Sequence, residues 1–336
     1  KNKNEEIIRF QVNSFTDEKT LQQIKEIKIL GKNEKLFPIQ FQNSKNLEET
    51  LARFISSRKV PQNRSFAKKI IQETGNDDFM GYIDISFGLS LNDTLWIVPN
   101  EKEKLKWEKV NLYKNPFSER LQMASFGLGY DGSSAYKISP EFTTNGMLKK
   151  CWIKEDDGIY LLKTNSEKGF DRNTQHLEVF SEYYISQIAK LFKKNSVEYD
   201  IVDFKEQLCS KCKLFTSEKQ GYLPIMAFLS EDELRQGEKI LSDRTHFINK
   251  AIEIYGKENY EDLMLFDSII GNRDRHLGNF GMLVDNHAFE VIKPAPIFDN
   301  GESVLNYYNF SKNLDFGMYA SRTNSLGQRF SDVFKT

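Results

Sequence analysis

Cysteine is scarce in this chain of 336 residues, which contains only Cys151, Cys209 and Cys212. An odd count of this size argues against a disulfide framework and favours a reducing compartment. No run of about 18 apolar residues occurs, so no transmembrane helix is expected. The opening sequence, KNKNEEIIRF, lacks the apolar core of a signal peptide. The expected location is therefore the cytoplasm.

A charge excess of either sign is also lacking, because 47 Lys and Arg residues balance 48 Asp and Glu residues to a net charge of -1. No global basic field results, so neither nucleic acid nor an acidic membrane is an expected direct partner. Cys209 and Cys212 form a C-x-x-C pair, but a structural zinc site needs a second pair of ligands at short spacing. Cys151 and the four scattered histidines do not supply one, so we interpret the cysteine pair as structural.

The spacing of apolar residues predicts a chain that mixes helices and strands. Helical spacing is found over residues 21–28, 47–57, 65–74, 176–192 and much of 231–270. Aromatic and branched residues predict one or two strands over 81–99, and an apolar run predicts a buried strand over 222–229. The pair Asp157-Gly158 between two apolar runs is typical of a β-hairpin.

A polar loop, GNRDRHLGNFG, follows the last predicted helix and carries residues suited to phosphoryl transfer. That reaction needs a carboxylate to orient and deprotonate a hydroxyl, oxygen ligands for Mg²⁺, and a lysine on the phosphates. Asp274 and Asn279 stand five apart, as the base and a metal ligand do in protein kinases. Asp299, in FDNG after the next apolar runs, is the expected second metal ligand. Asp and Asn also favour ordinary turns, so the prediction depends on all these motifs occurring in order.

Lys163 ends the apolar run GIYLLK and is the expected phosphate-binding lysine. Its carboxylate partner is expected on the following helix, where Glu178 and Glu182 are both candidates. Arg275 and His276 lie inside the polar loop. For His276, a contact with the phosphates and a structural hydrogen bond within the loop are both open.

The candidate phosphate loop is TTNGMLKK, residues 143–150, in which Thr144, Asn145 and Gly146 precede a predicted strand. A tight turn at Asn145-Gly146 can expose backbone N–H groups to phosphate oxygens. FGLGYDG, residues 126–132, is a competing glycine-rich segment. The adenine-binding hinge is expected at Met226, Ala227 and Phe228.

DRHLGN followed by FDNG resembles the inverted catalytic loop, D-R-H-x-x-N and then D-x-G, of phosphoinositide kinases and of HipA-like bacterial kinases. The sequence GNRDRHLGNFG is most similar to the HipA-like, CtkA-like group, and FSEY at 180–183 resembles its corresponding helix, which favours Glu182. The likeness consists of scattered motifs between residues 125 and 305. It implies a bilobal α+β kinase fold that uses ATP and Mg²⁺ to phosphorylate Ser or Thr of a protein substrate.

The resemblance also implies an organisation and a mode of regulation. We expect an accessory domain over 1–124, a kinase N-lobe over 125–229 and a C-lobe over 230–336. HipA-like kinases autophosphorylate a loop hydroxyl, and Thr143 and Thr144 occupy the similar place. Some members are toxins neutralised by a DNA-binding partner, so an antitoxin or regulatory protein is an expected kind of partner. The alternatives are a pseudokinase regulatory module and a lipid or small-molecule kinase.

Overall fold

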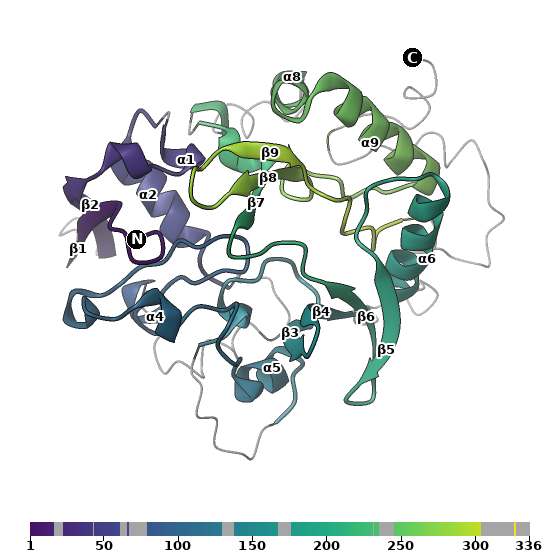
Figure 1. The fold of residues 1–336 in the computed structure, drawn as a ribbon, viewed down its shortest axis with the longest axis horizontal. Helices are drawn as coiled ribbons and strands as arrows, with labels where there is room; N and C mark the ends of the chain where they lie inside the picture. The colour runs from purple at the N-terminus through teal and green to yellow at the C-terminus, as the bar shows by residue number, and fades with distance from the viewer. Residues whose placement is uncertain are drawn as a thin grey trace.

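The computed structural model describes residues 1–16, 23–42, 44–60, 66, 79–129, 138–166, 176–230, 232–234, 245–303 and 326. Over these residues the chain forms three antiparallel sheets with helices packed around them (Figure 1). The mixed architecture agrees with the α+β prediction. Within the described residues, no helix is long and apolar enough to cross a membrane.

The first sheet is the hairpin of β1 (Ile8–Thr16) and β2 (Gln23–Lys32). Helical spacing around 21–28 was the wrong prediction: Ile27 and Ile29 alternate with polar residues, and pairing with β1 places them on one face of a strand. The short α1 (Ile39–Gln42) and α2 (Leu47–Ser56) follow, and α2 packs against β2. Asn46 caps α2 by accepting the Glu49 N–H, which confirms the helix predicted over 47–57. Of the helix predicted over 65–74, all but residue 66 lies outside the described residues.

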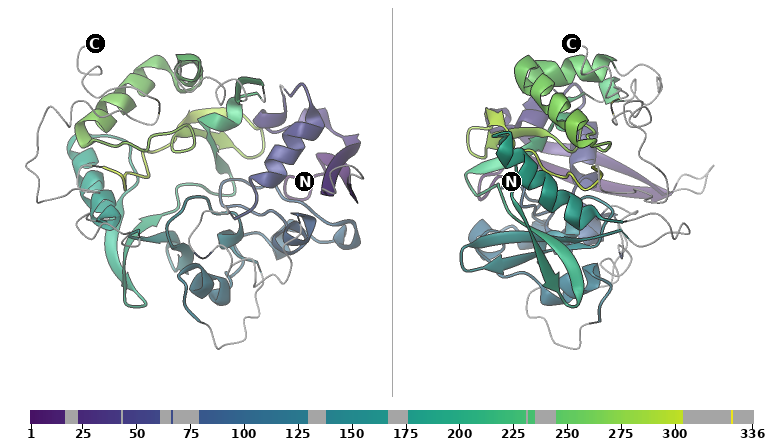
Figure 2. Two further views of the ribbon diagram at one scale, coloured as in Figure 1. Left: turned by 180° about the vertical axis from the view of Figure 1, so that it is seen from behind. Right: turned by 90° about the vertical axis from the view of Figure 1, so that its right-hand side faces the viewer.

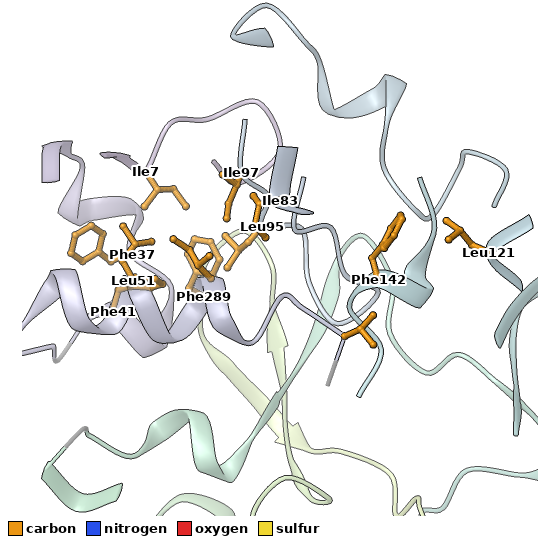
Figure 3. Packing of buried hydrophobic residues seen from close by; sticks show 12 residues of the cluster. Ile7, Phe37, Phe41, Leu51, Ile83, Leu95, Ile97, Leu121, Phe142 and Phe289 are labelled. Atoms are coloured by element: carbon orange, nitrogen blue, oxygen red, sulfur yellow. The ribbon is translucent and has the colours of Figure 1, made fainter. Parts of the chain in front are cut away.

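The strands predicted over 81–99 were also wrong, because α4 (Phe79–Ser86) occupies the first part of this segment. Phe87 and Gly88 both have left-handed backbone conformations that end the helix, and only Leu95 forms an isolated bridge, to Asn2. The branched residues of this segment enter a core rather than a sheet, as Ile83, Leu95 and Ile97 do in Figure 3. Burial of apolar side chains therefore outweighed local strand preference.

The second sheet contains β3 (Lys150–Glu155), β4 (Gly158–Thr164), β6 (Gln207–Lys213) and β5 (Tyr199–Phe204), in that order across the sheet. Glu155 pairs with Gly158, which confirms the predicted hairpin but places its turn at residues 156–157, one position before the predicted Asp157-Gly158 pair. The helix α6 (Glu178–Leu191) packs against β4, β5 and β6, and α5 (Glu119–Ser125) packs against β3.

The third sheet joins β7 (Gln220–Pro224), β8 (Gly281–Asp285) and β9 (Val291–Pro294). The run 222–229 was predicted as one strand, but after Pro224 the chain turns into the 3-10 helix η5 (Ile225–Phe228). Because β7 pairs with β8, this sheet crosses the predicted lobe boundary at 229, and the domain division stays a prediction. The helices α8 (Thr245–Tyr255) and α9 (Lys257–Ile270) lie between β7 and β8 in the chain. Gly271 ends α9 in a left-handed conformation.

The remaining short 3-10 helices among the described residues are η1 (Glu34–Leu36), η2 (Asn100–Lys102), η3 (Trp107–Lys109) and η4 (Pro140–Phe142). Seen from the side in Figure 2, α6 lies between the four-stranded sheet and α9. Ile185 and Ala189 of α6 pack against Phe266 and Ile270 of α9. The helix α6 therefore contacts both the four-stranded sheet and α9, which both contribute to the site described below.

The two cysteines of the C-x-x-C pair lie on β6 and belong to different cores. Cys209 packs with Cys151 and Leu162, whereas Cys212 packs with Tyr199. Residues three apart on a strand point to opposite faces, so these two thiols cannot share one metal ion. Burial raises the pKa of both thiols to about 12. Within the described part of the chain, no cluster of three or more His, Cys, Asp or Glu side chains is arranged to hold a metal.

Gly281 marks the closest backbone approach in the third sheet. A Cβ at this position would lie 2.2 Å from the Leu223 carbonyl oxygen and 2.6 Å from Pro224 Cα. Gly281→Ala should therefore lower the free energy of unfolding by about 1–3 kcal/mol, measured by urea denaturation. The control is Gly129→Ala, where an added Cβ meets no atom within 4 Å and stability should stay within about 0.5 kcal/mol. Equal effects of the two substitutions would contradict the packing described here.

Candidate active site

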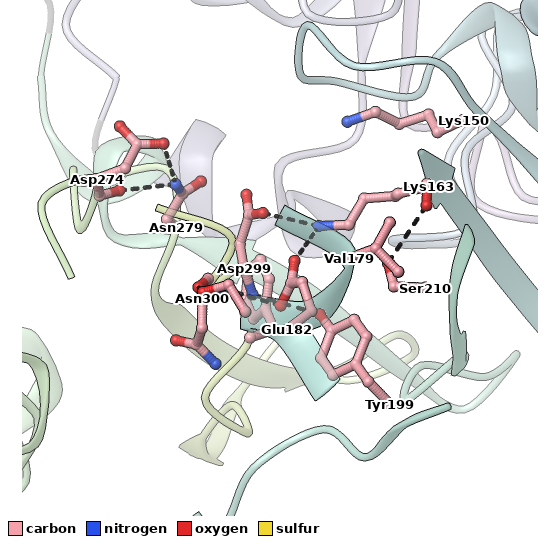
Figure 4. A network of polar contacts seen from close by, with 12 residues as sticks. Lys150, Lys163, Val179, Glu182, Tyr199, Ser210, Asp274, Asn279, Asp299 and Asn300 are labelled. Atoms are coloured by element: carbon pink, nitrogen blue, oxygen red, sulfur yellow. Dashed lines mark hydrogen bonds and ion pairs between the residues drawn. The ribbon is translucent and has the colours of Figure 1, made fainter. Parts of the chain in front are cut away.

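Lys163, at the end of β4, connects three parts of the chain. Its Nζ lies 2.5 Å from Glu182 Oε1 of α6 and 2.8 Å from Asp299 Oδ1, which follows β9 (Figure 4). Burial alone lowers the pKa of a lysine, but the charges of Asp299 and Glu182 outweigh it, so the pKa of Lys163 is raised well above its ordinary value. The ammonium therefore stays charged inside the protein.

The geometry distinguishes the two candidate glutamates of α6. Glu182 uses one carboxylate oxygen for Lys163 and accepts the Asn300 N–H at 3.0 Å with the other. Glu178 lies one turn earlier, is also buried, and accepts the hydroxyl of Ser166. Glu182 is thus the partner of Lys163, as the sequence comparison with FSEY favoured.

The backbone at Asp299 has a left-handed conformation, with φ of 59°. For a residue other than glycine this geometry costs about 1–3 kcal/mol and persists only where its surroundings impose it. Both peptide groups of Asn300 are fixed by α6, since its N–H is donated to Glu182 and its carbonyl accepts the Ser181 hydroxyl at 2.8 Å. Ser181 was not predicted, and nothing in the sequence marks it except its place beside Glu182.

Arg275 is fully buried and organises the polar loop from within. Its guanidinium contacts both carboxylate oxygens of Asp267, at 2.9 and 3.0 Å. It also donates to the carbonyls of Asn279 and Phe298 and to Asn300 Oδ1, at 2.8, 2.6 and 2.7 Å. One side chain thereby ties α9 to the loop and to the segment around Asp299. Arg275 is a structural residue and does not project into the site.

Asp274 and Asn279 lie side by side at the mouth of the loop. Asn279 Nδ2 donates to the Asp274 carbonyl at 2.8 Å and to Asp274 Oδ2 at 3.3 Å. Because both of these partners are acceptors, the amide atom that faces them is the nitrogen Nδ2. Asn279 Oδ1 therefore faces the side on which the Asp299 carboxylate lies (Figure 4). Burial raises the pKa of Asp274 above its ordinary value, and the charge of His276 opposes this shift while that of Asp299 adds to it.

His276 is exposed on the loop surface, and its Nδ1 accepts the Gly278 N–H at 3.0 Å. This contact supports the turn of the loop backbone. It fits the structural alternative for His276 better than a contact with phosphates, although the catalytic role stays a prediction.

Lys150 is a second buried lysine at the site, and it was not predicted. It begins β3 directly opposite Lys163, so both side chains rise from the same face of the sheet (Figure 4). Burial alone raises the pKa of Asp299, but Lys163 and then Lys150 outweigh it and hold that pKa well below its ordinary value. The register of the hairpin is the feature that locates Lys150. When Glu155 pairs with Gly158, residue 150 lies opposite residue 163.

The candidate phosphate loop precedes β3, and its glycine has the conformation that the prediction required. Gly146 has φ of 91°, and Asn145 and Gly146 are exposed. The Asn145 carbonyl accepts Lys150 Nζ at 2.9 Å, which joins the loop to the lysine pair. In the competing segment, Gly127 belongs to the turn that ends α5, and residues 130–132 lie outside the described residues.

The predicted hinge residues Met226, Ala227 and Phe228 form the 3-10 helix η5. The Met226 N–H donates to the Leu277 carbonyl at 3.0 Å, so it is engaged by the polar loop. This contact ties the hinge segment to the loop that carries Asp274. The role of these residues in binding adenine stays a prediction.

Comparison with known proteins places this geometry in context. No protein-family model matches the chain. Over 184 residues it is 25% identical to "Serine/threonine-protein kinase CtkA" of Helicobacter pylori, which covers 52% of this chain and 51% of CtkA. The chain thus spans about half the length of this curated relative. The solved structure of CtkA aligns with a TM-score of 0.41 at 21% identity, covering 49% of this chain and 58% of that one.

A second solved structure decides the fold. HipA of the Shewanella oneidensis MR-1 toxin–antitoxin system, in complex with HipB and operator DNA, aligns with a TM-score of 0.53 at 12% identity. The alignment covers 87% of this chain and 75% of HipA. The chain has a HipA-like fold. The HipA-like fold confirms the predicted architecture, and within it the predicted residues Lys163, Glu182 and Asp299 are in contact, as are Asp274 and Asn279.

Arg275→Lys should lower the free energy of unfolding by about 3 kcal/mol, because a lysine cannot reach all the acceptors and leaves Asp267 poorly paired in the interior. Urea denaturation measures the change. Arg273→Lys is the matched control in the same loop, since Arg273 is exposed and its substitution should stay within about 0.5 kcal/mol. Similar stability of both variants would contradict the organising role of Arg275.

Proposed function

We propose that this chain is an ATP- and Mg²⁺-dependent protein kinase of the HipA-like type that phosphorylates Ser or Thr. The observation that carries this function is the contact of Lys163 with both Glu182 and Asp299, beside the Asp274–Asn279 pair. A pseudokinase has no need of all these groups in reactive positions. The similarity to CtkA, a protein named as a serine/threonine kinase, supports the same activity.

The oxygen atoms at the site fit Mg²⁺. Asn279 Oδ1 and the Asp299 carboxylate would hold the ion, and Mg²⁺ in kinase sites is bound by few protein ligands together with phosphate oxygens and water. When bound there, Mg²⁺ would supply positive charge that neutralises the phosphates of ATP. Asp299 already has a charged carboxylate, because Lys163 and Lys150 lower its pKa.

The remaining residues would position the two substrates. Lys163 and Lys150 would contact the phosphates of ATP, and the exposed N–H groups around Asn145 and Gly146 would cover them. Asp274 would accept the proton of the substrate hydroxyl. The oxygen of that hydroxyl would bond to the γ-phosphorus of ATP as the bond between the γ-phosphorus and the β-phosphate oxygen breaks. The raised pKa of Asp274 suits a group that must accept a proton.

A protein partner of the antitoxin or regulatory kind belongs to the same proposal. The solved HipA structure contains HipB and operator DNA, and that assembly is a property of HipA. For this chain, co-purification with the product of a neighbouring gene, followed by a kinase assay of the complex, would test for such a partner.

Incubation with ATP labelled at the γ-phosphate tests the activity directly. Parallel reactions would contain a mixture of proteins, phosphoinositide vesicles, or no acceptor. Label on Ser or Thr of protein is the expected result. Label on lipid alone would instead assign a lipid kinase, and no transfer in any reaction would assign a pseudokinase.

Asp274→Asn should lower kcat at least about 100-fold, because the nearly isosteric amide cannot accept the proton. ATP binding, measured by calorimetry, should change little. Asp200→Asn, on the exposed side of β5, is the matched control and should retain wild-type turnover. Wild-type turnover in Asp274→Asn would remove Asp274 from the mechanism.

Autophosphorylation at Thr143 or Thr144 should silence the enzyme. Thr143 Oγ1 is buried and donates to the Leu89 carbonyl at 2.7 Å, and Thr144 Oγ1 donates to the Pro140 carbonyl at 2.7 Å. A phosphate carries about two negative charges and cannot donate to these carbonyls, so a modified loop must leave this position. ATP affinity should then fall.

Mass spectrometry after incubation with Mg-ATP checks the modification, with Asp274→Asn as the control that should stay unmodified. Binding measurements on the modified protein check its effect. Absence of phosphate on residues 139–146 would end the idea of autoregulation, and an unchanged ATP affinity would show that the modification is not an off-switch.

A further inference from the structure

A cavity of about 360 Å³ lies beside β1, and neither Asp274 nor Lys163 lines it. Its walls include residues of two chain segments, 6–12 and 95–103, and its remaining lining comes mainly from Pro38, Phe41, Leu51 and Phe54. The volume falls within the range of about 300–1,000 Å³ that is usual for ligand sites. This cavity therefore has the size of a binding site separate from the proposed kinase site.

The cavity lies alongside β1. Within this strand it is lined by Ile8, Arg9, Phe10 and Val12, with a register shift between Arg9 and Phe10. Among the described strands, β1 pairs only with β2, so its other edge has no strand beside it. A two-stranded sheet is marginal by itself, and an open edge can accept a further strand by backbone hydrogen bonding.

Contacts connect the two wall segments near both of their ends. The Lys3 N–H donates to the Thr94 carbonyl at 3.1 Å, which joins them near their starts. At the outer end Arg9 reaches across to Glu103 at 3.3 Å. Between these contacts the cavity forms a slot, which we call the β1 slot.

The floor of the β1 slot is apolar. Ile7, Leu95 and Ile97 come from the two walls and are buried above Phe41 and Leu51 (Figure 3). Their side chains form a surface for a large aliphatic or aromatic side chain. Such a group would contribute most of its affinity by leaving water.

The rim of the β1 slot is acidic. Carboxylates outnumber cations among its lining residues, with Glu6, Asp84, Glu101 and Glu103 against Lys1 and Arg9, although Arg9 is paired with both Glu6 and Glu103. This charge disfavours nucleotides and other phosphate-bearing ligands. It favours a ligand that carries Lys or Arg beside its apolar groups.

We infer that the β1 slot binds an extended, basic peptide segment of a partner protein. The segment adds to the open edge of β1, inserts apolar side chains over Ile7 and Ile97, and places Lys or Arg side chains against the acidic rim. This site lies outside the kinase machinery, and its existence does not depend on the proposed activity.

Fluorescence anisotropy of the full chain with labelled peptides tests the inference. The probe is the amidated peptide Lys-Ile-Lys-Tyr-Arg-Val-Lys. One comparison peptide replaces its basic residues with Glu, and the other replaces its apolar residues with Ser. Saturable binding of the probe, with both comparison peptides at least about tenfold weaker, is the expected result.

A charge reversal at the rim locates the binding. Glu103→Lys should weaken the probe about fivefold, because an exposed attraction becomes a repulsion. Glu198→Lys, which makes the same charge change at a side chain 73% exposed in another part of the chain, should have no effect. When the probe peptide is bound, hydrogen exchange of the backbone amides should slow at residues 8–12.

Several results would overturn the inference. They are no saturable binding, equal binding of the Glu peptide, equal binding by Glu103→Lys, and protection that maps outside β1 and residues 95–103. Binding of an apolar dye in the slot without binding of the probe would assign the cavity to small apolar molecules instead. None of these outcomes requires kinase activity, so they are distinguishable from a failure of the proposed function.

Discussion

The buried guanidinium of Arg275 is the interaction on which the rest of the site depends. It contacts Asp267 on α9, the carbonyl of Asn279 in the polar loop, and Phe298 and Asn300 beside Asp299. Burying such a charge is costly unless it is paired, and here its contacts lie on three segments of the site: α9, the polar loop and the segment around Asp299. This one side chain therefore helps to fix the relative positions of the proposed base Asp274 and the proposed metal ligands Asn279 and Asp299.

The helix α6 supplies the second constraint. Glu182 and Ser181 hold both peptide groups of Asn300, and Glu182 also holds Lys163 of the four-stranded sheet. The left-handed backbone of Asp299 is therefore imposed from two sides, by α6 and by Arg275. A displacement of α6 would release Lys163 and the segment around Asp299 together. Through α6, the geometry thus couples Lys163, the proposed phosphate-binding lysine, to Asp299, the proposed metal ligand.

Much of this site could be predicted from sequence because the proposed chemistry requires particular residues at particular spacings. Asp274, Asn279 and Asp299 were recognisable in order, whereas Lys150 was not predicted, because its place opposite Lys163 follows from the pairing of Glu155 with Gly158 in the folded hairpin. Ser181 could not be found, since it acts through a backbone carbonyl 119 residues away. A contact of that kind leaves no local pattern.

The fold was predictable where local patterns and packing agree. The helix α2 has a cap and a clear apolar stripe, and it was predicted correctly. At α4 the branched residues favour a strand locally, yet the helix buries Ile83 in a core shared with Leu95. Similarly, β2 depends on its partner β1 for its conformation. Contacts with residues distant in the sequence determine the conformation of these two segments. The local sequence of each segment does not reveal those contacts.

The central claim is that Asp299, held in place by Arg275 and α6, is the ligand that makes nucleotide binding depend on Mg²⁺. A titration of Mg²⁺ against ATP affinity, for the wild-type chain and Asp299→Ala, tests it most directly. Wild-type affinity should rise with Mg²⁺, and this rise should be lost in Asp299→Ala but kept in the control Asp203→Ala, an exposed residue of β5. Superimposable curves for wild type and Asp299→Ala would contradict the account, because the metal ligand would then lie elsewhere.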